Sequence, residues 1–330
     1  MIRIAVLGAG RIGRIHAANA AANPRCRLVA VADIVEAAAS SLARSLGCEA
    51  AGDPAATIAR EDVDAVVIGT PTDTHVALLL EAARRGKAVL CEKPVDLNLR
   101  KVDEAAAEIE KLAARVMVAF NRRFDPSAAA VRRAIDAGAI GAVRQVVITS
   151  RDPAPPPPSY IASSGGIFRD MTIHDFDMAR WLLGEEPSAV FACASTLVDP
   201  AIGAAGDFDS VMIVMRTPSG RQCHINNCRE AAYGYDQRIE VFGVRGMLLN
   251  DNLRPSTLRR YDASETEARE PLLNFFLERY AEAYRLELDA FLAAVAEGKT
   301  MPLTVADGRR ALRLADAALE SASTGRAVTV

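Results

Sequence analysis

The stretch that decides the fold is Ile2-Arg3-Ile4-Ala5-Val6-Leu7-Gly8-Ala9-Gly10-Arg11-Ile12-Gly13, near the start of a chain of 330 residues. An apolar, β-branched run leads directly into three glycines spaced G-x-G-x-x-G, and an alanine-rich helical segment follows. Gly8 permits a tight turn, Gly10 lets a ligand phosphate approach the backbone, and Gly13 lets helix and strand pack closely. Free N–H groups and the positive helix end then face the phosphate. The context predicts a dinucleotide-binding turn.

An acidic residue, Asp33, lies 20 residues beyond Gly13, at the predicted end of the second strand. A carboxylate there can accept hydrogen bonds from the adenosine ribose hydroxyls. The same charge would repel a 2′-phosphate, and the next residues, Ile34 and Val35, supply no arginine. We therefore expect NAD as the cofactor in preference to NADP. The alternative is a glycine turn beside a capping aspartate.

The first 120 residues alternate β-branched strands with alanine-rich helices, which is typical of β-α-β units around a parallel sheet. Strands are expected at residues 2–7, 28–32, 65–68, 88–91 and 116–120, and helices at 12–22, 36–46, 74–85 and 99–114. This pattern predicts an α/β fold whose N-terminal part, residues 1–121, is a Rossmann-type doubly wound parallel sheet that binds NAD.

The pattern changes after Asn121. We expect helices at residues 127–137, 277–295 and 305–324, and strands at 143–150, 189–196, 210–216, 222–228, 238–242 and 247–249. The run Pro155 to Pro158 indicates a stiff loop. Residues 122–330 are therefore predicted to form an α+β domain for substrate binding and oligomerisation, with a large, mostly antiparallel open sheet. Its last helix, about 304–325, is expected to pack back on the first domain.

Composition argues against several classes of protein. A net charge of −3 without a basic patch favours neither nucleic acid nor an anionic membrane as a partner. No signal-peptide pattern opens the chain, and no apolar run approaches the roughly 18 residues of a membrane span, so a cytoplasmic protein is expected. The six cysteines form no C-x-x-C pair and there are four histidines, so we expect no metal site. Redox chemistry would then depend on an organic cofactor.

Two more segments end predicted strands and so lie at the carboxyl edge of the sheet, where such folds bind ligands. Thr70-Pro71-Thr72-Asp73-Thr74-His75 is placed to touch the nicotinamide half, although Thr72 or Asp73 can equally be helix caps. Cys91-Glu92-Lys93-Pro94 ends the next strand, and packing explains its lysine poorly. A partly desolvated ammonium there can hydrogen-bond a reacting hydroxyl and favour its ionisation.

A third segment, Gly165 to Asp177, places a histidine between two carboxylates at helical spacing. Asp170, His174 and Asp177 fall within about 60° of one another around a helix, while apolar residues occupy the opposite side. One face is thus predicted to carry a proton-transfer site while the other packs. The alternative is a buried histidine held by neighbouring acids. Asp175 falls in the apolar arc, and the pattern does not explain it.

Taken together, these motifs identify the chain as similar, from end to end, to the Gfo/Idh/MocA oxidoreductase family. The resemblance is carried by G-A-G-R-I-G at 8–13, C-E-K-P at 91–94 and the D-x-x-x-H of Asp170 and His174. Within the family the chain is most similar to inositol-oxidising members, through residues 121–125, 150–155, 165–181 and 232–236.

The resemblance implies an NAD-dependent enzyme of inositol catabolism that oxidises myo-inositol to 2-keto-myo-inositol (scyllo-inosose). His174 would be the general base, for which an unperturbed pKa near about 6.5 is suitable. Lys93 would polarise the reacting hydroxyl, and Asp170 would hold substrate and catalytic network in place. The implied cofactor contacts are Gly8, Gly10, Arg11, Ile12, Gly13, Asp33, Thr70, Pro71, His75, Glu92 and Lys93. The implied substrate contacts are Lys93, Arg122, Asp170, His174, Asp177 and Tyr235.

Several alternatives remain open. Scyllo-inositol, another cyclitol or a pyranose would suit the same catalytic residues, and Asn121 stands where some members carry an apolar residue. A non-catalytic NAD-binding regulator would be expected to lack Lys93 or His174, and both are present. Without the resemblance, Arg122 and Arg123 suggest a solvated or ion-paired loop, and Tyr233 and Tyr235 a half-buried strand pair. The open sheet would leave one face uncovered, which predicts a homo-oligomer, and the resemblance implies a tetramer.

Overall fold

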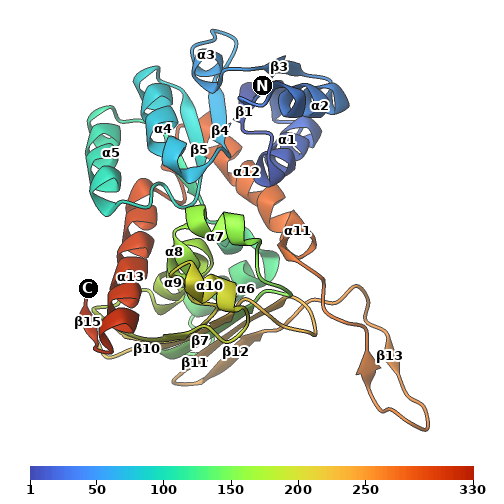
Figure 1. Cartoon of the computed structure of the whole chain (residues 1–330), viewed down its shortest axis with the longest axis vertical. Coiled ribbons are helices and arrows are strands. Elements are labelled where there is room, and N and C mark those ends of the chain that lie inside the picture. The colour runs from blue at the N-terminus through green and yellow to red at the C-terminus, as the bar shows by residue number, and fades with distance from the viewer. The chain divides into compact units, whose positions relative to one another are not determined.

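The computed structural model describes residues 1–330, apart from the side chains of residues 158 and 162. The chain divides into two compact units, drawn with all their elements in Figure 1. The first unit comprises Met1–Phe124 and Ala283–Leu312, and the second comprises Asp125–Glu282 and Arg313–Val330. Helix α13, Val305–Thr324, gives its first residues to the first unit and the remainder to the second.

The first unit is built on a six-stranded parallel sheet with the order β3-β2-β1-β4-β5-β6. Strands β4, β5 and β6 are buried along their whole length, which explains their nearly continuous apolar sequences. The predicted doubly wound Rossmann-type sheet is confirmed. The strands are β1 Ile2–Leu7, β2 Cys26–Ala32, β3 Glu49–Ala51, β4 Ala65–Ile68, β5 Ala88–Glu92 and β6 Val116–Ala119.

The strand order reverses between β1 and β4, which are neighbours in the sheet. Because β-α-β crossovers are right-handed, this reversal places α1 and α2 on one face and α4 and α5 on the other (Figure 1). The carboxyl ends of β1 and β4 meet at the switch point, where doubly wound sheets bind ligands. The helices and 3-10 turns are α1 Arg11–Ala22, α2 Glu36–Leu46, α3 Pro54–Ile58, η1 Thr72–Thr74, α4 His75–Arg84, α5 Leu99–Lys111, η2 Asn121–Phe124 and α12 Ala281–Glu297.

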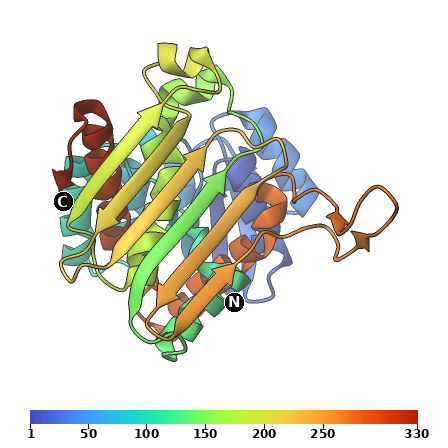
Figure 2. The ribbon, with the colours of Figure 1, turned by 90° about the horizontal axis from the view of Figure 1, so that it is seen from below.

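The second unit contains a seven-stranded sheet with the order β12-β11-β7-β10-β9-β8-β15, seen face-on in Figure 2. Only the β7–β10 pair is parallel, so the predicted large and mostly antiparallel open sheet is confirmed. The strands are β7 Val143–Arg151, β8 Ala189–Ser195, β9 Ser210–Arg216, β10 Gln222–Cys228, β11 Asp236–Gly243, β12 Gly246–Asn250 and β15 Val328–Thr329.

One face of this sheet packs on helices and forms the core of the second unit, with Ile148, Ile213 and Ile225 facing α9 residues such as Phe176. Along strands such as β9, every second side chain points away from this core, toward the other face of the sheet. That face is uncovered and lies toward the viewer in Figure 2. Met212 and Val214 are 57% and 51% exposed there. The helices are α6 Pro126–Asp136, α7 Pro158–Ser164, α8 Gly166–Asp170, α9 Thr172–Leu183, α10 Pro200–Ala204 and α11 Phe276–Arg279.

The segment around Asp170 differs from the expected single helix, because Met171 separates α8 from α9. Every residue of α9 except His174 and Trp181 is buried, so the expected division into a packed face and an open face does not hold. Asp175 is buried because the sheet supplies hydrogen bonds to it: Ser150 Oγ donates to one carboxylate oxygen and Asn227 Nδ2 to the other, both at 2.8 Å. A polar anchor thus lies inside the apolar arc.

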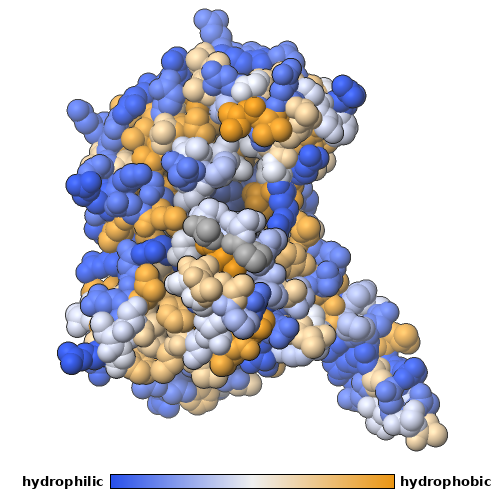
Figure 3. Space-filling view, in the orientation of Figure 1, coloured by the Kyte–Doolittle hydropathy of each residue, from blue (hydrophilic) through white to orange (hydrophobic). Residues whose placement is uncertain are grey.

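Residues 251–274 form an extended arm with a short hairpin, β13 Arg259–Arg260 and β14 Ala268–Arg269. The sequence pattern predicted no helix or strand in this segment. Its surface is mostly hydrophilic in Figure 3, with ion pairs such as that between Arg259 and Glu267. Among the residues that the structure describes, none of the helices is both long and apolar enough to cross a membrane.

Candidate active site

The glycine-rich turn between β1 and α1 is packed as tightly as its spacing predicts. A Cβ on Gly13 would lie 1.9 Å from the Gly8 carbonyl oxygen, and one on Gly8 would lie 2.5 Å from the carbonyl oxygen of Gly69. By contrast, a Cβ on Gly10 would meet no atom within 4 Å. Gly8 and Gly13 are therefore needed for backbone packing, whereas Gly10 leaves open space at the positive end of α1, which suits the phosphates of a dinucleotide.

The carboxylate of Asp33 is tied to the same turn. Its Oδ2 accepts a hydrogen bond from the Ala9 N–H at 2.6 Å, and its Oδ1 accepts one from the Val35 N–H at 2.8 Å. Asp33 therefore stabilises the glycine-rich turn in addition to the ribose-binding role predicted for it. Ile34 and Val35 are exposed beside it, and neither contributes positive charge toward a 2′-phosphate.

His75 holds two loops of the sheet edge together. It is buried at the start of α4, and its ring nitrogens lie 2.8 Å from the Pro94 carbonyl oxygen and 2.9 Å from that of Thr70. Thr70 Oγ1 is also within 2.7 Å of Thr74 Oγ1. His75 was predicted as a cofactor contact. In the structure its ring bonds the backbone of the loops after β4 and β5.

Lys93 follows β5 directly, at the carboxyl edge of the sheet. Its backbone N–H donates to Glu92 Oε2 at 3.2 Å, and the Lys93–Pro94 peptide is cis. Burial raises the pKa of the neighbouring Cys91 thiol, and the Glu92 carboxylate raises it further, so Cys91 stays protonated. The lysine ammonium, and not the thiol, is thus the group at this strand end that is suited to polar chemistry.

The first unit also contains the arginine pair after β6, in η2. Arg122 is buried, and Arg123 lies 3.6 Å from the Asp307 carboxylate. Asn121 is buried beside them. Neither arginine is therefore part of a solvated loop.

In the second unit, Asp170 ends α8 and its carboxylate is fixed from two sides. Tyr160 donates its hydroxyl hydrogen to Oδ1 at 2.8 Å, and Arg229 NH1 donates to Oδ2 at 3.2 Å. Arg229 is almost fully buried and also reaches Asp207 Oδ2 at 3.4 Å. Tyr160, Arg229 and Asp207 were not predicted as site residues from the sequence. Arg229 directly follows a predicted strand, and that position was the available sign that it belongs to the site. The sign is weak, because the sequence does not tell which strands are neighbours.

His174 lies in the first turn of α9, four residues after Asp170, and is partly exposed where its neighbours are buried. Asp177 lies on the same helix but is buried, and Arg180 NH1 is 3.4 Å from its Oδ1. Of the predicted triplet, Asp170 and His174 are thus partly exposed and Asp177 is buried, and His174 carries the imidazole.

The tyrosine pair after β10 lies in a loop and does not form the strand pair considered above, because β11 begins at Asp236. Tyr235 is buried, with its ring against Phe275 at 5.6 Å and Tyr280 at 6.1 Å between centroids. Tyr233 instead donates to Asp236 Oδ2 and lies 2.7 Å from Arg151 NH1. The two tyrosines thus have different surroundings.

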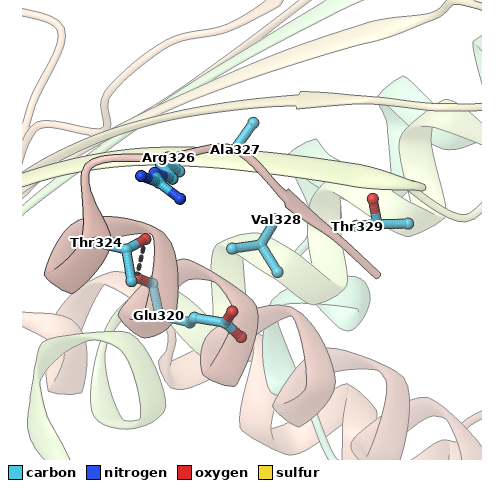
Figure 4. A pocket seen from close by; sticks show the side chains of 6 residues that line it. All are labelled: Glu320, Thr324, Arg326, Ala327, Val328 and Thr329. Atoms are coloured by element: carbon cyan, nitrogen blue, oxygen red, sulfur yellow. Dashed lines mark hydrogen bonds between the residues drawn. The ribbon is translucent and has the colours of Figure 1, made fainter.

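Other parts of the molecule offer less chemistry. A hollow of about 680 Å³ at the chain end, shown in Figure 4, is lined by Glu320, Thr324, Arg326, Ala327, Val328 and Thr329, and it contains none of the predicted site residues. Its Thr324 hydroxyl bonds the Glu320 carbonyl oxygen of the same helix. Among the described residues, no three His, Cys, Asp or Glu side chains gather as metal ligands would.

Comparison with known proteins agrees with these features. Residues 2–120 match an oxidoreductase family with an NAD-binding Rossmann fold, and residues 128–249 match the Gfo/Idh/MocA C-terminal domain. The chain belongs to the Gfo/Idh/MocA family of oxidoreductases. Like the family, it is an NAD-dependent oxidoreductase, and the open space at Gly10 fits that cofactor.

Relatives within the Gfo/Idh/MocA family cover the whole chain. It is 51% identical to an inositol 2-dehydrogenase of Rhizobium meliloti, covering 100% of this chain and 99% of the relative. It is 45% identical to a myo-inositol 2-dehydrogenase of Thermotoga maritima, covering 99% and 98%. A crystal structure of scyllo-inositol dehydrogenase from Lactobacillus casei with NAD(H) and scyllo-inositol is 29% identical, with a TM-score of 0.92 over 100% of this chain and 99% of that one.

The glycine turn gives a matched pair of variants. In Gly13→Ala the new Cβ collides with the Gly8 carbonyl, so we expect the free energy of unfolding to fall by about 3 kcal/mol or more. Gly10→Ala has room for its Cβ and a φ of −71°, so it should unfold near the wild-type temperature. It should still bind NAD about tenfold or more weakly, because the methyl group occupies the phosphate approach. Thermal unfolding and NAD titration measure both effects, and equal stability of the two variants would contradict the packing argument.

Proposed function

We propose that this protein oxidises myo-inositol to 2-keto-myo-inositol with NAD. The observation that carries the proposal is the full-length likeness to inositol 2-dehydrogenases, together with the presence of Lys93, Asp170 and His174 at their motif positions. The chemistry of each side chain supports it. An ammonium follows β5 at the carboxyl edge of the sheet, and a partly exposed imidazole lies in the first turn of α9.

In the proposed reaction, bound NAD supplies the acceptor for the hydride at carbon 4 of its nicotinamide. His174 takes the hydroxyl proton as general base, and the O–H electron pair becomes the second bond of the carbonyl as the C–H pair leaves with the hydride. The Lys93 ammonium donates a hydrogen bond to the same oxygen, which stabilises negative charge as the proton departs. Proton and hydride therefore leave the carbinol in one balanced oxidation.

The other polar residues are proposed to orient substrate and cofactor. Asp170 is fixed by Tyr160 and Arg229 and can accept hydrogen bonds from substrate hydroxyls. Arg122, Asp177 and Tyr235 are proposed as further substrate contacts, because a ring with many hydroxyls needs both donors and acceptors. The proposed cofactor contacts are Gly8, Gly10, Arg11, Ile12, Gly13, Asp33, Thr70, Pro71, His75, Glu92 and Lys93.

A second candidate substrate is scyllo-inositol. The Lactobacillus casei structure with that isomer shares the fold at 29% identity, so one scaffold accommodates it. The buried Asn121 beside Arg122 makes this part of the chain polar, and a polar wall affects which hydroxyl orientation is preferred. Only substrate-contacting residues would separate the two isomers.

A polyol assay tests the proposed reaction. We expect NADH absorbance to rise when the protein is mixed with NAD and myo-inositol, and to rise less with scyllo-inositol, glucose or NADP. NADP should be the poorer cofactor because Asp33 repels its 2′-phosphate. Turnover of scyllo-inositol alone would favour the second candidate, and no turnover of any polyol would contradict both.

His174 gives a direct test of the proton-transfer role. His174→Ala should lower kcat by about a hundredfold or more, because general-base catalysis contributes that much, while NAD affinity stays unchanged. His224→Ala is the matched control, since His224 lies on β10 among none of the proposed contacts and should leave turnover as in the wild type. Steady-state rates and NAD titration measure the difference. A His174→Ala rate equal to that of the control would show that another group takes the proton.

We also propose that the protein is a homo-oligomer, specifically a tetramer, through the uncovered sheet face. That face presents Phe191, Met212, Val214, Phe242, Met247 and Leu249, all exposed. Exposed apolar side chains gathered on one sheet face favour an interaction surface, and a second copy can bury the same face on itself.

Two charges on this face should disrupt the assembly. The double change Met212→Asp and Val214→Asp would bury like charges against their symmetry mates, so the molar mass from light scattering should fall below that of the wild type. Leu112→Asp, an exposed apolar residue at the end of α5, is the control and should leave the mass unchanged. An unchanged mass for the double variant would exclude this face as the interface.

A further inference from the structure

The first unit contains a buried acid that the proposed reaction does not use. Glu287, on the inner side of α12, is 0% exposed. Neither of its carboxyl oxygens has a hydrogen-bond partner among the residues that the structure describes. Burial raises the pKa of this carboxyl well above its ordinary value, and the charge of Glu92 raises it further. A buried carboxyl without a cation or donor keeps its proton.

Contacts between α1 and α12 show where this acid lies. The ring of His16 on α1 meets the ring of Tyr284 on α12 edge-on, with centroids 5.6 Å apart. Further along, Asn23 Nδ2 donates to Asp289 Oδ1 at 2.8 Å. Glu287 lies between these two contacts in sequence and on the same side of α12 as Tyr284, three residues away. The acid therefore faces α1 close to His16.

His16 connects this region to the segment that carries Lys93. It is 0% exposed, and its Nε2 lies 2.8 Å from Glu92 Oε1. The second oxygen of Glu92 accepts the backbone N–H of Lys93. The Glu92 carboxylate at the end of β5 thus contacts His16 through one oxygen and the Lys93 backbone through the other. Lys93 is the residue proposed to polarise the substrate.

The titratable groups around Glu287 favour one arrangement of charges. The rings of His16 on α1 and Tyr284 on α12 meet in this region, and the charge of Glu92 acts on Glu287 from β5. None of these is a permanent cation, so ionising both Glu287 and Glu92 would place two negative charges in one buried region. One carboxyl must stay neutral. Glu92, which is slightly exposed and bonded to both His16 and the Lys93 N–H, is the better anion.

We propose that Glu287 is a protonated positioning residue: its neutral carboxyl leaves Glu92 as the single anion, and His16 and Glu92 together fix the backbone at Lys93. Glu287 and His16 touch no substrate in this scheme and act through Glu92. The positioning part rests on the proposed role of Lys93, whereas the protonation of Glu287 does not depend on any activity.

Infrared spectroscopy of the whole protein tests the proton directly. We expect a carbonyl band of a protonated carboxylic acid at neutral pH that is lost in Glu287→Gln. The matched control is Glu297→Gln on the same helix, whose exposed carboxyl has a lowered pKa because Lys299 bonds it. That variant should keep the band. A band equally present in Glu287→Gln, or absent from the wild type, would overturn the proposal.

The pH dependence of unfolding is a second test of whether Glu287 keeps its proton. Between the ordinary pKa of a carboxyl and the raised pKa of Glu287, the unfolded chain releases a proton that the native protein keeps. The free energy of unfolding of the wild type therefore falls as pH rises through that window. Glu287→Gln has no such proton and should not show this fall. The melting temperature of Glu287→Gln relative to wild type should rise from about pH 5 to about pH 8. A difference that stays constant with pH would contradict a retained proton.

Two His16 variants test the positioning. His16→Leu removes the donor to Glu92, so kcat for inositol oxidation should fall by about tenfold or more while NAD affinity changes little. His16→Gln keeps an N–H donor and should restore most of the rate. Equal rates for His16→Leu and wild type would refute the positioning role, and so would equal losses in both variants. If His16→Leu fails to fold, the glutamine variant and the infrared band still decide. A wild type without polyol turnover would contradict the proposed function and leave the infrared result standing.

Discussion

The close approach of three backbone segments at the switch point is the constraint on which the first unit depends. Gly8, Gly13 and Gly69 come from β1, α1 and the end of β4, and a single Cβ on Gly13 would lie 1.9 Å from a carbonyl oxygen. This contact sets the distance between helix and sheet, and Asp33 anchors the turn through the Ala9 N–H. Because the carboxyl ends of parallel strands share one edge, the same constraint brings Thr70 and Lys93 to that edge.

Much of this arrangement follows from the sequence, since β4, β5 and β6 are apolar runs buried along their whole length and the four predicted helices are long enough for a crossover. The glycine spacing and the strand ends predict which side chains reach the edge. Short elements such as β3 and α3 were not predicted, because three to five residues carry too little periodicity. The arm at residues 251–274 escaped prediction for a related reason: its hairpin strands have two residues each.

The second unit shows where pattern reasoning is limited. Asp175 is a charged residue on the apolar side of its helix. The pairing of β10 with β7 explains it, because that pairing brings Ser150 and Asn227 side by side, where both donate hydrogen bonds to the Asp175 carboxylate. Arg229 fixes Asp170 across 59 residues of sequence. Both depend on which strands are neighbours, and local periodicity does not contain that information. Buried polar groups have hydrogen-bond partners as a rule, and here those partners lie far away in the sequence. They are therefore the part of the site that is hardest to predict from the sequence.

Distant partners also surround the segment that carries Lys93. His75 bonds the Pro94 carbonyl oxygen from the side of β4, and Glu92 bonds the Lys93 N–H from β5 itself. A lysine side chain has large rotational freedom, so ordering its ammonium is costly, and in the proposed reaction a fixed backbone would reduce how much of that order the substrate must supply. A carboxylate suits the contact with the Lys93 N–H, because a carboxylate forms stronger hydrogen bonds to N–H groups than a neutral acceptor does. A buried anion is costly unless its neighbours are neutral, cationic or donate hydrogen bonds to it, and in the proposed arrangement Glu287 is the neutral neighbour of Glu92 and His16 the donor.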